Sequence, residues 1–347
     1  MRCCDMVSNS LGSDVEINRL IDKLLETVGD MHHPEKIREM LLSVIKIGVD
    51  VDYLADLKMI SQTLRELSET TRVFAPYRHK RKVTIFGSAR TGHNNEMYQK
   101  CLKFSRALAE QGYMTITGGG PGIMQAGNEG AGSENSFAAN ILLPFEQEPN
   151  RVMSQTNRLI TYRYFFNRKV ALVKEADALV VFPGGFGTLD EAMEVSTLIQ
   201  TGKTSPRPLI LIDDQEGYWE QFLNFVKESM LLNDFISAED FSIFTITRDE
   251  NEAVRVIENF YRIYHSLRFI KNRLVIRLKK RLTPEQINIL EEEFSDLMKE
   301  GDHICSCGPY PEEADEPDLA ALHRISLIFD HGRYGLLLAF IRRINTF

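Results

Sequence analysis

Three short glycine-rich runs are the residues of this 347-residue sequence best suited to chemistry. They are Gly87-Ser88, Gly118-Gly119-Gly120-Pro121-Gly122 and Pro183-Gly184-Gly185-Phe186-Gly187-Thr188. Glycine lets the backbone turn tightly and approach a ligand that a Cβ atom would block. A helix that begins just after such a turn points its free N–H groups and the positive end of its dipole at the same place. The runs therefore predict a binding site for a phosphate or carboxylate, to which Thr188 would add a hydroxyl donor.

Three other interpretations explain the glycine runs less well than an anion-binding site does: simple turns, a site for ATP hydrolysis and a site for hydride transfer. One run alone could be an ordinary tight turn between a strand and a helix, but three at one sheet edge favour a ligand site. No Lys-Ser or Lys-Thr pair follows the glycines, as the phosphate-binding loop of nucleoside triphosphatases requires. No run matches G-x-G-x-x-G cleanly, and the ribose-binding acid expected about 20 residues later is unclear. The sequence thus disfavours both ATP hydrolysis and hydride transfer.

The elements that would position these loops alternate between strand and helix from about residue 80 to 265. Runs of β-branched or apolar residues predict strands at 82–86, 113–117, 138–143, 177–182, 208–212 and 244–247. Helices are predicted between them, for example at 95–110 and 219–231. The run 177–182 is apolar almost throughout, which is typical of a strand buried on both faces of a parallel sheet. This order predicts an α/β fold with a Rossmann-like, doubly wound parallel sheet, whose glycine loops share the ligand-binding edge.

Two flanking regions differ from this core. The first carries apolar residues at helical spacing, and the last combines strand-like runs at 274–278 and 325–329 with helices that follow each of them. The predicted domains are therefore a helical N-terminal region at 1–75, the α/β core at 76–268 and a small α+β C-terminal region at 269–347.

Composition excludes several classes of protein. Apolar residues make up 43% and charged residues 26%, as in a globular protein, and the net charge of -8 does not suit general nucleic-acid binding. No apolar run approaches the roughly 18 residues that span a membrane, and the first residues lack the apolar segment of a secretory signal. We therefore expect a cytoplasmic protein that binds neither membrane nor nucleic acid.

Five cysteines do not form a disulfide framework in a chain of this size. Cys3 and Cys4 lie near the terminus, and Cys101 falls in a predicted helix. Cys305 and Cys307 form a lone C-x-C near His303, without the second ligand pair that a structural zinc site needs. We expect reduced thiols and no bound metal.

Two of the glycine runs resemble signature motifs of the LONELY GUY (LOG) family. Residues 118–124 resemble its GGGxxGxM motif, and residues 183–191 fit its PGGxGTxxE motif at every fixed position. The resemblance covers about 80–265, while the flanking regions resemble the longer members, which include bacterial nucleotide 5′-monophosphate nucleosidases. Many members carry the label lysine decarboxylase, but no pair of residues here suggests the pyridoxal phosphate chemistry of such an enzyme. No cofactor is expected.

The resemblance implies hydrolysis of the N-glycosidic bond of a nucleoside 5′-monophosphate, either AMP-like or a cytokinin ribotide, to the free base and ribose 5-phosphate. Glu191 is the motif glutamate, which would stabilise positive charge at the anomeric carbon and activate water. Arg168 resembles the arginine of the family's Arg-Lys pair, and would bind the ligand and hold Glu191 ionised. The plainer alternatives are an acid at a helix start for Glu191 and a solvated arginine for Arg168. Phe166 stands where short members often carry His, which leaves the base contacts open.

The remaining contacts to the substrate are predicted mostly in the glycine runs. The predicted substrate-binding residues are Gly87, Ser88, Gly119, Gly120, Gly122, Met124, Glu129, Lys169, Gly184, Gly185, Gly187 and Thr188. Glu129 would either reach the ribose hydroxyls or be a surface acid, and Arg90, Arg158 and Arg163 flank the same edge. The resemblance also implies a homo-oligomer, either a dimer or an assembly of dimers.

A non-catalytic nucleotide-sensing protein on the same fold is the main alternative function. A pure binder has no need of a carboxylate at the anomeric centre, so Glu191 and Arg168 favour the enzyme. A scaffold with a vestigial core is disfavoured by the complete second motif.

Overall fold

The computed structural model describes residues 14–143 and 148–347, so Cys3 and Cys4 lie outside the described ranges. The chain divides into two compact units, one that ends at Ser68 and one that begins at Glu69. Among the described residues, no helix is both long and apolar enough to cross a membrane.

The first unit is helical, as the sequence predicts. It contains α2 (Val15–Val28), α3 (Pro34–Asp50) and most of α4 (Leu54–Phe74). The Asp14 carboxylate caps α2 by accepting hydrogen bonds from the backbone N–H groups of Glu16 and Ile17, and α2 packs on α3 around the buried Ile21. Several apolar side chains of these helices stay exposed, among them Leu20, Leu24, Met40 and Val44.

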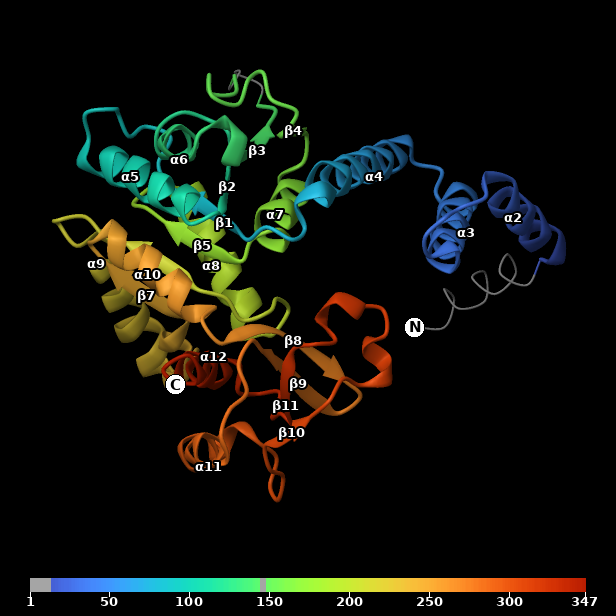
Figure 1. Ribbon diagram of the computed structural model, residues 1–347. Helices are drawn as coiled ribbons and strands as arrows, with labels where there is room; N and C mark the ends of the chain where they lie inside the picture. The colour runs from blue at the N-terminus through green and yellow to red at the C-terminus, as the bar shows by residue number, and fades with distance from the viewer. Residues whose placement is uncertain (1–13, 144–147) are drawn as a thin grey trace. The chain divides into compact units, whose positions relative to one another are not determined.

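A seven-stranded parallel sheet forms the centre of the second unit (Figure 1). The strand order is β4-β3-β2-β1-β5-β6-β7, so the chain builds outward from β1 in one direction and then in the other. The strands are β1 (Lys82–Phe86), β2 (Met114–Thr117), β3 (Ser136–Ile141), β4 (Leu159–Tyr162), β5 (Ala178–Val181), β6 (Leu209–Ile212) and β7 (Phe244–Thr247). The doubly wound α/β fold predicted from the sequence is confirmed.

Helices cover both faces of this sheet. The helices are α5 (Glu96–Glu110), α6 (Ile123–Ala131), α7 (Phe165–Lys174), α8 (Phe186–Gln200), α9 (Tyr218–Phe225) and α10 (Glu250–Phe260). In β5, Ala178 and Val180 pack in one core cluster with α5, α6 and α10, while Leu179 and Val181 pack in the other with α7, α8 and α9. All four residues are fully buried, which explains why this strand is apolar along its whole length.

The C-terminal region forms a second, antiparallel sheet with the order β10-β11-β9-β8 (Figure 1). Its elements are β8 (Tyr264–Ile270), β9 (Arg273–Leu278), α11 (Pro284–Glu293), β10 (Cys305–Cys307), β11 (His323–Leu327) and α12 (Tyr334–Ile344). Leu337 and Ile341 of α12 join the same core cluster as Ile257 of α10, so the C-terminal region shares a core with the main sheet.

Three strands have no counterpart among the predicted ones. β4 has only four residues and follows a polar loop, β8 mixes polar and apolar residues without regular alternation, and β10 has only three residues, so none shows a clear strand pattern. The predicted boundary between 268 and 269 falls inside β8, which pairs with β9 and therefore belongs with the second sheet.

Candidate active site

Backbone hydrogen bonds join the three glycine-rich loops at the carboxyl edge of the main sheet. Ser88 N–H in the loop after β1 donates to the carbonyl of Pro183 after β5 at 3.1 Å, and Ile123 N–H after β2 donates to the carbonyl of Ser88 at 3.0 Å. A Cβ on Gly122 would lie 2.3 Å from the carbonyl oxygen of Ser88, and Gly122 has a φ of +66°. Both facts require glycine there. The loops thus meet at one edge, where open parallel sheets bind ligands.

A cleft of about 850 Å³ opens at this edge. Nine of the residues predicted for the site line it, namely Gly87, Ser88, Met124, Arg168, Gly184, Gly185, Gly187, Thr188 and Glu191. The apolar part of the wall includes Phe86, Ile141, Leu143, Phe165 and Phe186. The cleft therefore combines backbone amides and an apolar surface with two carboxylates, of Asp190 and Glu191, and two guanidiniums, of Arg90 and Arg168.

The amino end of α8 is an anion-binding element in this cleft. Gly185 is the N-cap and has no side chain to cap the helix, and the first intrahelical bonds run from Thr188 N–H and Leu189 N–H to its carbonyl. The preceding N–H groups, of Phe186 and Gly187, therefore lie before the intrahelical ladder begins. Together with the helix dipole they favour an anion in the cleft.

Glu191 lies on the core-facing stripe of α8, together with Thr188, Ala192, Val195 and Ile199. It is only 7% exposed, and among the described residues its Oε2 atom has no hydrogen-bond partner. Burial raises the pKa of Glu191 to about 7, although the neighbouring Lys169 and Arg168 partly oppose this. Such a carboxyl can exchange a proton near neutral pH.

Arg168 comes from the first turns of α7 and lies against the end of β2. A Cβ on Gly118 would approach Arg168 Nη2 to 2.4 Å, so this glycine makes room for the guanidinium. Burial lowers the pKa of Arg168, while the carboxylate of Glu191 opposes that effect. Its Nε atom is buried with no hydrogen-bond partner among the described residues. Arg168 therefore keeps donor capacity for a ligand.

Lys169 is placed differently from its neighbour. Its Nζ atom lies 2.8 Å from Asp190 Oδ2 and 2.7 Å from Glu194 Oε2, and it is not among the residues that line the cleft. Burial opposes the charged form of Lys169, but the bonds to both carboxylates outweigh burial and raise its pKa. Lys169 thus links α7, which carries Arg168, to α8, which carries Glu191, through ion pairs.

Four other predicted substrate contacts also lie outside the cleft lining. Gly119 and Gly120 use their carbonyls to accept hydrogen bonds from Asn150, and Gly122 packs against the loop after β1. Burial opposes the ionisation of Glu129, but hydrogen bonds from Gln125, Tyr98 and Arg151 outweigh it and lower the pKa. Glu129 is therefore held by protein groups at its present position.

The structure clarifies the first glycine motif. Counted back from Gly122 and Met124, the position of the motif's first glycine holds Thr117. The Thr117 hydroxyl accepts a hydrogen bond from Gly119 N–H at 3.0 Å and donates to Asn128 Oδ1 at 2.8 Å. The threonine thus supports the turn of the loop from within.

Sequence reasoning does not identify two aromatic residues of the site, Phe165 and Tyr218. Phe165, and not Phe166, lines the cleft, while the Phe166 ring stacks on Tyr164 at 5.3 Å. Tyr218 at the start of α9 donates to the carbonyl of Gly184 at 2.7 Å and so supports the loop after β5. Helical spacing could have identified Phe165, because residues three apart share a helix face and Phe165 lies three residues before Arg168.

The structure also shows where two of the flanking arginines and three of the cysteines lie. Arg90 lines the cleft, whereas Arg158 donates to the backbone carbonyls of Ser136 and Ser133, away from it. Cys101 is buried, and Cys305 and Cys307 are free thiols of the second sheet. In the described ranges, no three His, Cys, Asp or Glu side chains are grouped as a metal site.

Comparison with known proteins finds a matching family and several relatives. Residues 122–257 match the family described as "Possible lysine decarboxylase". The chain is 26% identical over 153 residues to the cytokinin riboside 5′-monophosphate phosphoribohydrolase LOG2 of Arabidopsis thaliana, across 43% of this chain and 70% of the relative. It is 24% identical over 183 residues to LOG7 of the same plant, across 52% of this chain and 82% of the relative.

Solved structures with a partial likeness include molybdenum cofactor proteins. The binding protein from Rippkaea orientalis is 18% identical, with a TM-score of 0.38, over 52% of this chain and 96% of that one. The carrier protein from Chlamydomonas reinhardtii is 17% identical, also with a TM-score of 0.38 and the same coverage. The two motifs, the family match and the plant relatives together support a relationship between the α/β core of this chain and the LONELY GUY (LOG) family.

Proposed function

We propose that the cleft hydrolyses the N-glycosidic bond of nucleoside 5′-monophosphates, releasing the free base and ribose 5-phosphate. The observation that carries this proposal is Glu191, whose carboxyl group is buried in the cleft wall with an unpartnered oxygen and a pKa raised to about 7. The plant relatives act on cytokinin riboside 5′-monophosphates, which have this chemistry. AMP-like nucleotides and cytokinin ribotides are both included in the proposed substrate class.

The proposed reaction needs only water and protein side chains. The bond between C1′ and the base nitrogen breaks, its electron pair leaves with the base, and positive charge develops on the ribose ring. The Glu191 carboxylate stabilises that charge and takes a proton from the attacking water, whose oxygen forms the new bond to C1′. The base nitrogen takes up one proton, so the products balance as free base and ribose 5-phosphate.

Each part of the cleft suits one part of such a substrate. The phosphate would bind at the amino end of α8, where the N–H groups of Phe186 and Gly187 and the Thr188 hydroxyl are placed. The base would lie on the apolar wall that includes Phe165 and Leu143. Arg168 would donate to the nucleotide and keep Glu191 ionised.

The test is to incubate the protein with a panel of nucleoside monophosphates, nucleosides and cytokinin ribotides, and to follow base release by chromatography. We expect release from monophosphates and much less from nucleosides, which lack the phosphate. Arg168→Ala should lower kcat/KM by about 10²-fold or more, because a misplaced substrate loses that much reactivity. Tight binding of monophosphates without any release would instead establish a nucleotide sensor.

We also propose that a second copy of the chain covers the mouth of the cleft. Phe165, Phe166 and Val170 of α7 are 53%, 48% and 47% exposed, and Phe186 of α8 is 93% exposed. Large apolar side chains gathered on two adjoining helices are typical of a contact surface. Light scattering should detect a dimer or an assembly of dimers, and Phe166→Glu should shift it toward monomers. A monomer in the unaltered protein contradicts this part of the proposal.

A cytoplasmic location is part of the same proposal. Cys101, Cys305 and Cys307 are free thiols, which suits a reducing compartment. Fractionation of cells that express the tagged chain would test it, and recovery from an extracellular fraction would refute it.

A further inference from the structure

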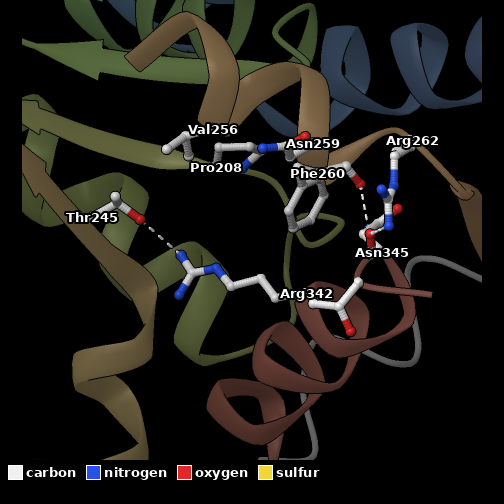
Figure 2. A pocket seen from close by; sticks show the side chains of 9 residues that line it. Pro208, Thr245, Val256, Asn259, Phe260, Arg262, Arg342 and Asn345 are labelled. Carbon is white, nitrogen blue, oxygen red and sulfur yellow. Dashed lines mark hydrogen bonds between the residues drawn. The ribbon is translucent and has the colours of Figure 1, made fainter. Parts of the chain in front are cut away.

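A second cavity, of about 470 Å³, lies at the opposite end of the main-sheet strands from the proposed active site. Its wall includes Pro208, which immediately precedes β6, and Thr245, the second residue of β7. The glycine loops of the cleft follow the carboxyl ends of the strands, whereas these residues belong to the amino ends. The last turn of α12, with Arg342, closes the other side (Figure 2). Among the residues that the structure describes, none lines both cavities.

The wall of this cavity is positively charged. Arg262 and Arg342 both line it, and no acidic residue of the described ranges does. Figure 2 shows the ring of Phe260 between the two arginine side chains in this view. Arg262 donates to the carbonyl of Asn345 and Arg342 Nη2 donates to Thr245 Oγ1 at 3.1 Å, so both are held by neutral oxygens.

Arg342 differs from the arginine beside it in α12. Arg343 forms a two-point ion pair with Glu293, at 2.7 and 3.0 Å, on the exposed side of the helix. Arg342 has no ion pair with any residue that the structure describes, and burial lowers its pKa. The helix dipole favours both residues of this last turn equally, so it does not account for a partly buried arginine without a counter-ion. Withdrawing such a charge from water, even in part, is unfavourable unless an anion pairs with it.

We propose that this cavity is a second, non-catalytic ligand site for a small phosphate monoester. Its volume lies in the range of small-molecule sites, about 300–1,000 Å³. A guanidinium presents its donors in a planar fork that matches phosphate oxygens, and the hydrogen bond from Arg342 to Thr245 occupies only part of that fork. The Phe260 ring and the Asn259 side chain provide apolar and polar contacts for the rest of the ligand.

Calorimetric titration of the full-length protein tests this site, with ribose 5-phosphate, AMP and inorganic phosphate as probes and adenosine as the uncharged control. To prevent turnover, every protein carries Glu191→Gln. We expect two binding events for a phosphate monoester, one of which weakens at least tenfold in Arg342→Gln. Adenosine should not bind at the Arg342-dependent site. Because the cavity also offers contacts to the rest of the ligand, the monoesters should bind there with higher affinity than inorganic phosphate.

Matched variants keep the result interpretable. Arg343→Gln, on the same turn but paired with Glu293, should leave both binding events unchanged. Arg342→Lys keeps the charge and should retain part of the affinity even if Arg342→Gln lowers the melting temperature. An identical isotherm for Arg342→Gln and its parent would overturn the second site. That outcome leaves the proposed hydrolysis untouched, because base release by the unaltered protein is measured separately.

Discussion

Two buried clusters of arginine and glutamate in this protein have opposite electrostatic character. At the cleft, Glu191 is 7% exposed, and burial raises its pKa to about 7. In the second sheet, Glu313 is 4% exposed and lies between Arg277 of β9 and Arg324 of β11. Burial also opposes the ionisation of Glu313, but hydrogen bonds from Tyr310 N–H, Arg324 and Arg277 outweigh it and lower the pKa. The pKa values of these two largely buried carboxyl groups are thus shifted in opposite directions.

The difference lies in how completely each carboxylate is satisfied. Arg277 Nε donates to Glu313 Oε1 at 2.7 Å, while Arg324 Nε and Tyr310 N–H donate to Oε2 at 3.0 and 2.9 Å. At the cleft, Glu191 Oε2 and Arg168 Nε have no partner among the described residues. A satisfied buried ion cluster contributes to the fold, whereas unfilled hydrogen-bonding capacity beside a cleft marks a place for a ligand.

The largest effect should follow Glu191→Gln, which keeps the shape of the side chain and removes the charge. We expect base release to fall by about 10³-fold, because the amide neither accepts a proton from water nor stabilises a cationic ribose. Nucleotide binding, measured by calorimetry, should remain. In the unaltered protein, kcat/KM should rise with pH up to about 7 and then level off, as the Glu191 carboxyl ionises.

Glu194→Gln provides the control for this change. Glu194 lies one turn further along α8 and contacts Lys169, but it does not line the cleft. Glu194→Gln should therefore reduce base release much less than Glu191→Gln does. Equal losses in the two variants, or full activity in Glu191→Gln, would remove Glu191 from the mechanism.

At the other cluster, Glu313→Gln should destabilise the fold without affecting the chemistry. Arg277 and Arg324 are 2% and 1% exposed, so the variant leaves two buried positive charges without their shared carboxylate. Breaking a buried ion pair on one side lowers the free energy of unfolding by about 3–5 kcal/mol, which urea denaturation will measure. The kcat of the folded fraction should not change. A stable Glu313→Gln protein with reduced kcat would mean that the two clusters are not separate in function.

The pH dependence of stability should also separate the clusters. The folded-state pKa of Glu191, about 7, exceeds the ordinary value of 4.5, so the folded protein binds more protons between these pH values. The free energy of unfolding must then fall as pH rises through this window. Removing the carboxyl by Glu191→Gln should therefore stabilise the protein by about 1–3 kcal/mol at pH 8 and hardly at all at pH 4.5. A gain of the same size at both pH values would contradict the raised pKa.

Most of the main sheet could be predicted from sequence because its strands are rich in apolar and β-branched residues and three of them, β1, β2 and β5, lead into glycine-rich loops. Ala178–Val181 and Leu209–Ile212 are buried on both faces, and no helix pattern competes with them. β8 could not be predicted, because four of its seven side chains are only partly buried and its partner β9 decides its conformation. Local pattern identifies an element that is buried by itself, but not one that depends on tertiary pairing.

The same distinction holds at the site. The motif predicts that Glu191 and Arg168 lie near the glycine loops, and helical spacing places Glu191 on the core-facing side of α8. Spacing cannot predict that Lys169 turns toward Asp190 and Glu194, since that depends on how α7 packs beside α8. The cavity at Arg342 was also beyond prediction, because its wall joins residues more than 100 positions apart in sequence, such as Pro208 and Arg342.

The smallest effect should follow Gly187→Ala, which tests whether the amino end of α8 must stay open. A Cβ on Gly187 meets no atom within 4 Å, so the folded protein accommodates it, and the change should stabilise the helix by about 0.4–1 kcal/mol. The added methyl group nevertheless lies in the cleft, beside the amides proposed to hold the phosphate, and should raise KM several-fold with little change in kcat. Gly48→Ala is the matched control, because Gly48 lies in α3 with equally open space around it and lines neither cavity. Both variants should gain stability in thermal denaturation, but only Gly187→Ala should bind nucleotide more weakly. An unchanged KM in Gly187→Ala would move the phosphate away from α8 while leaving Glu191 as the proposed catalytic group, because the two assignments rest on different atoms of the same helix.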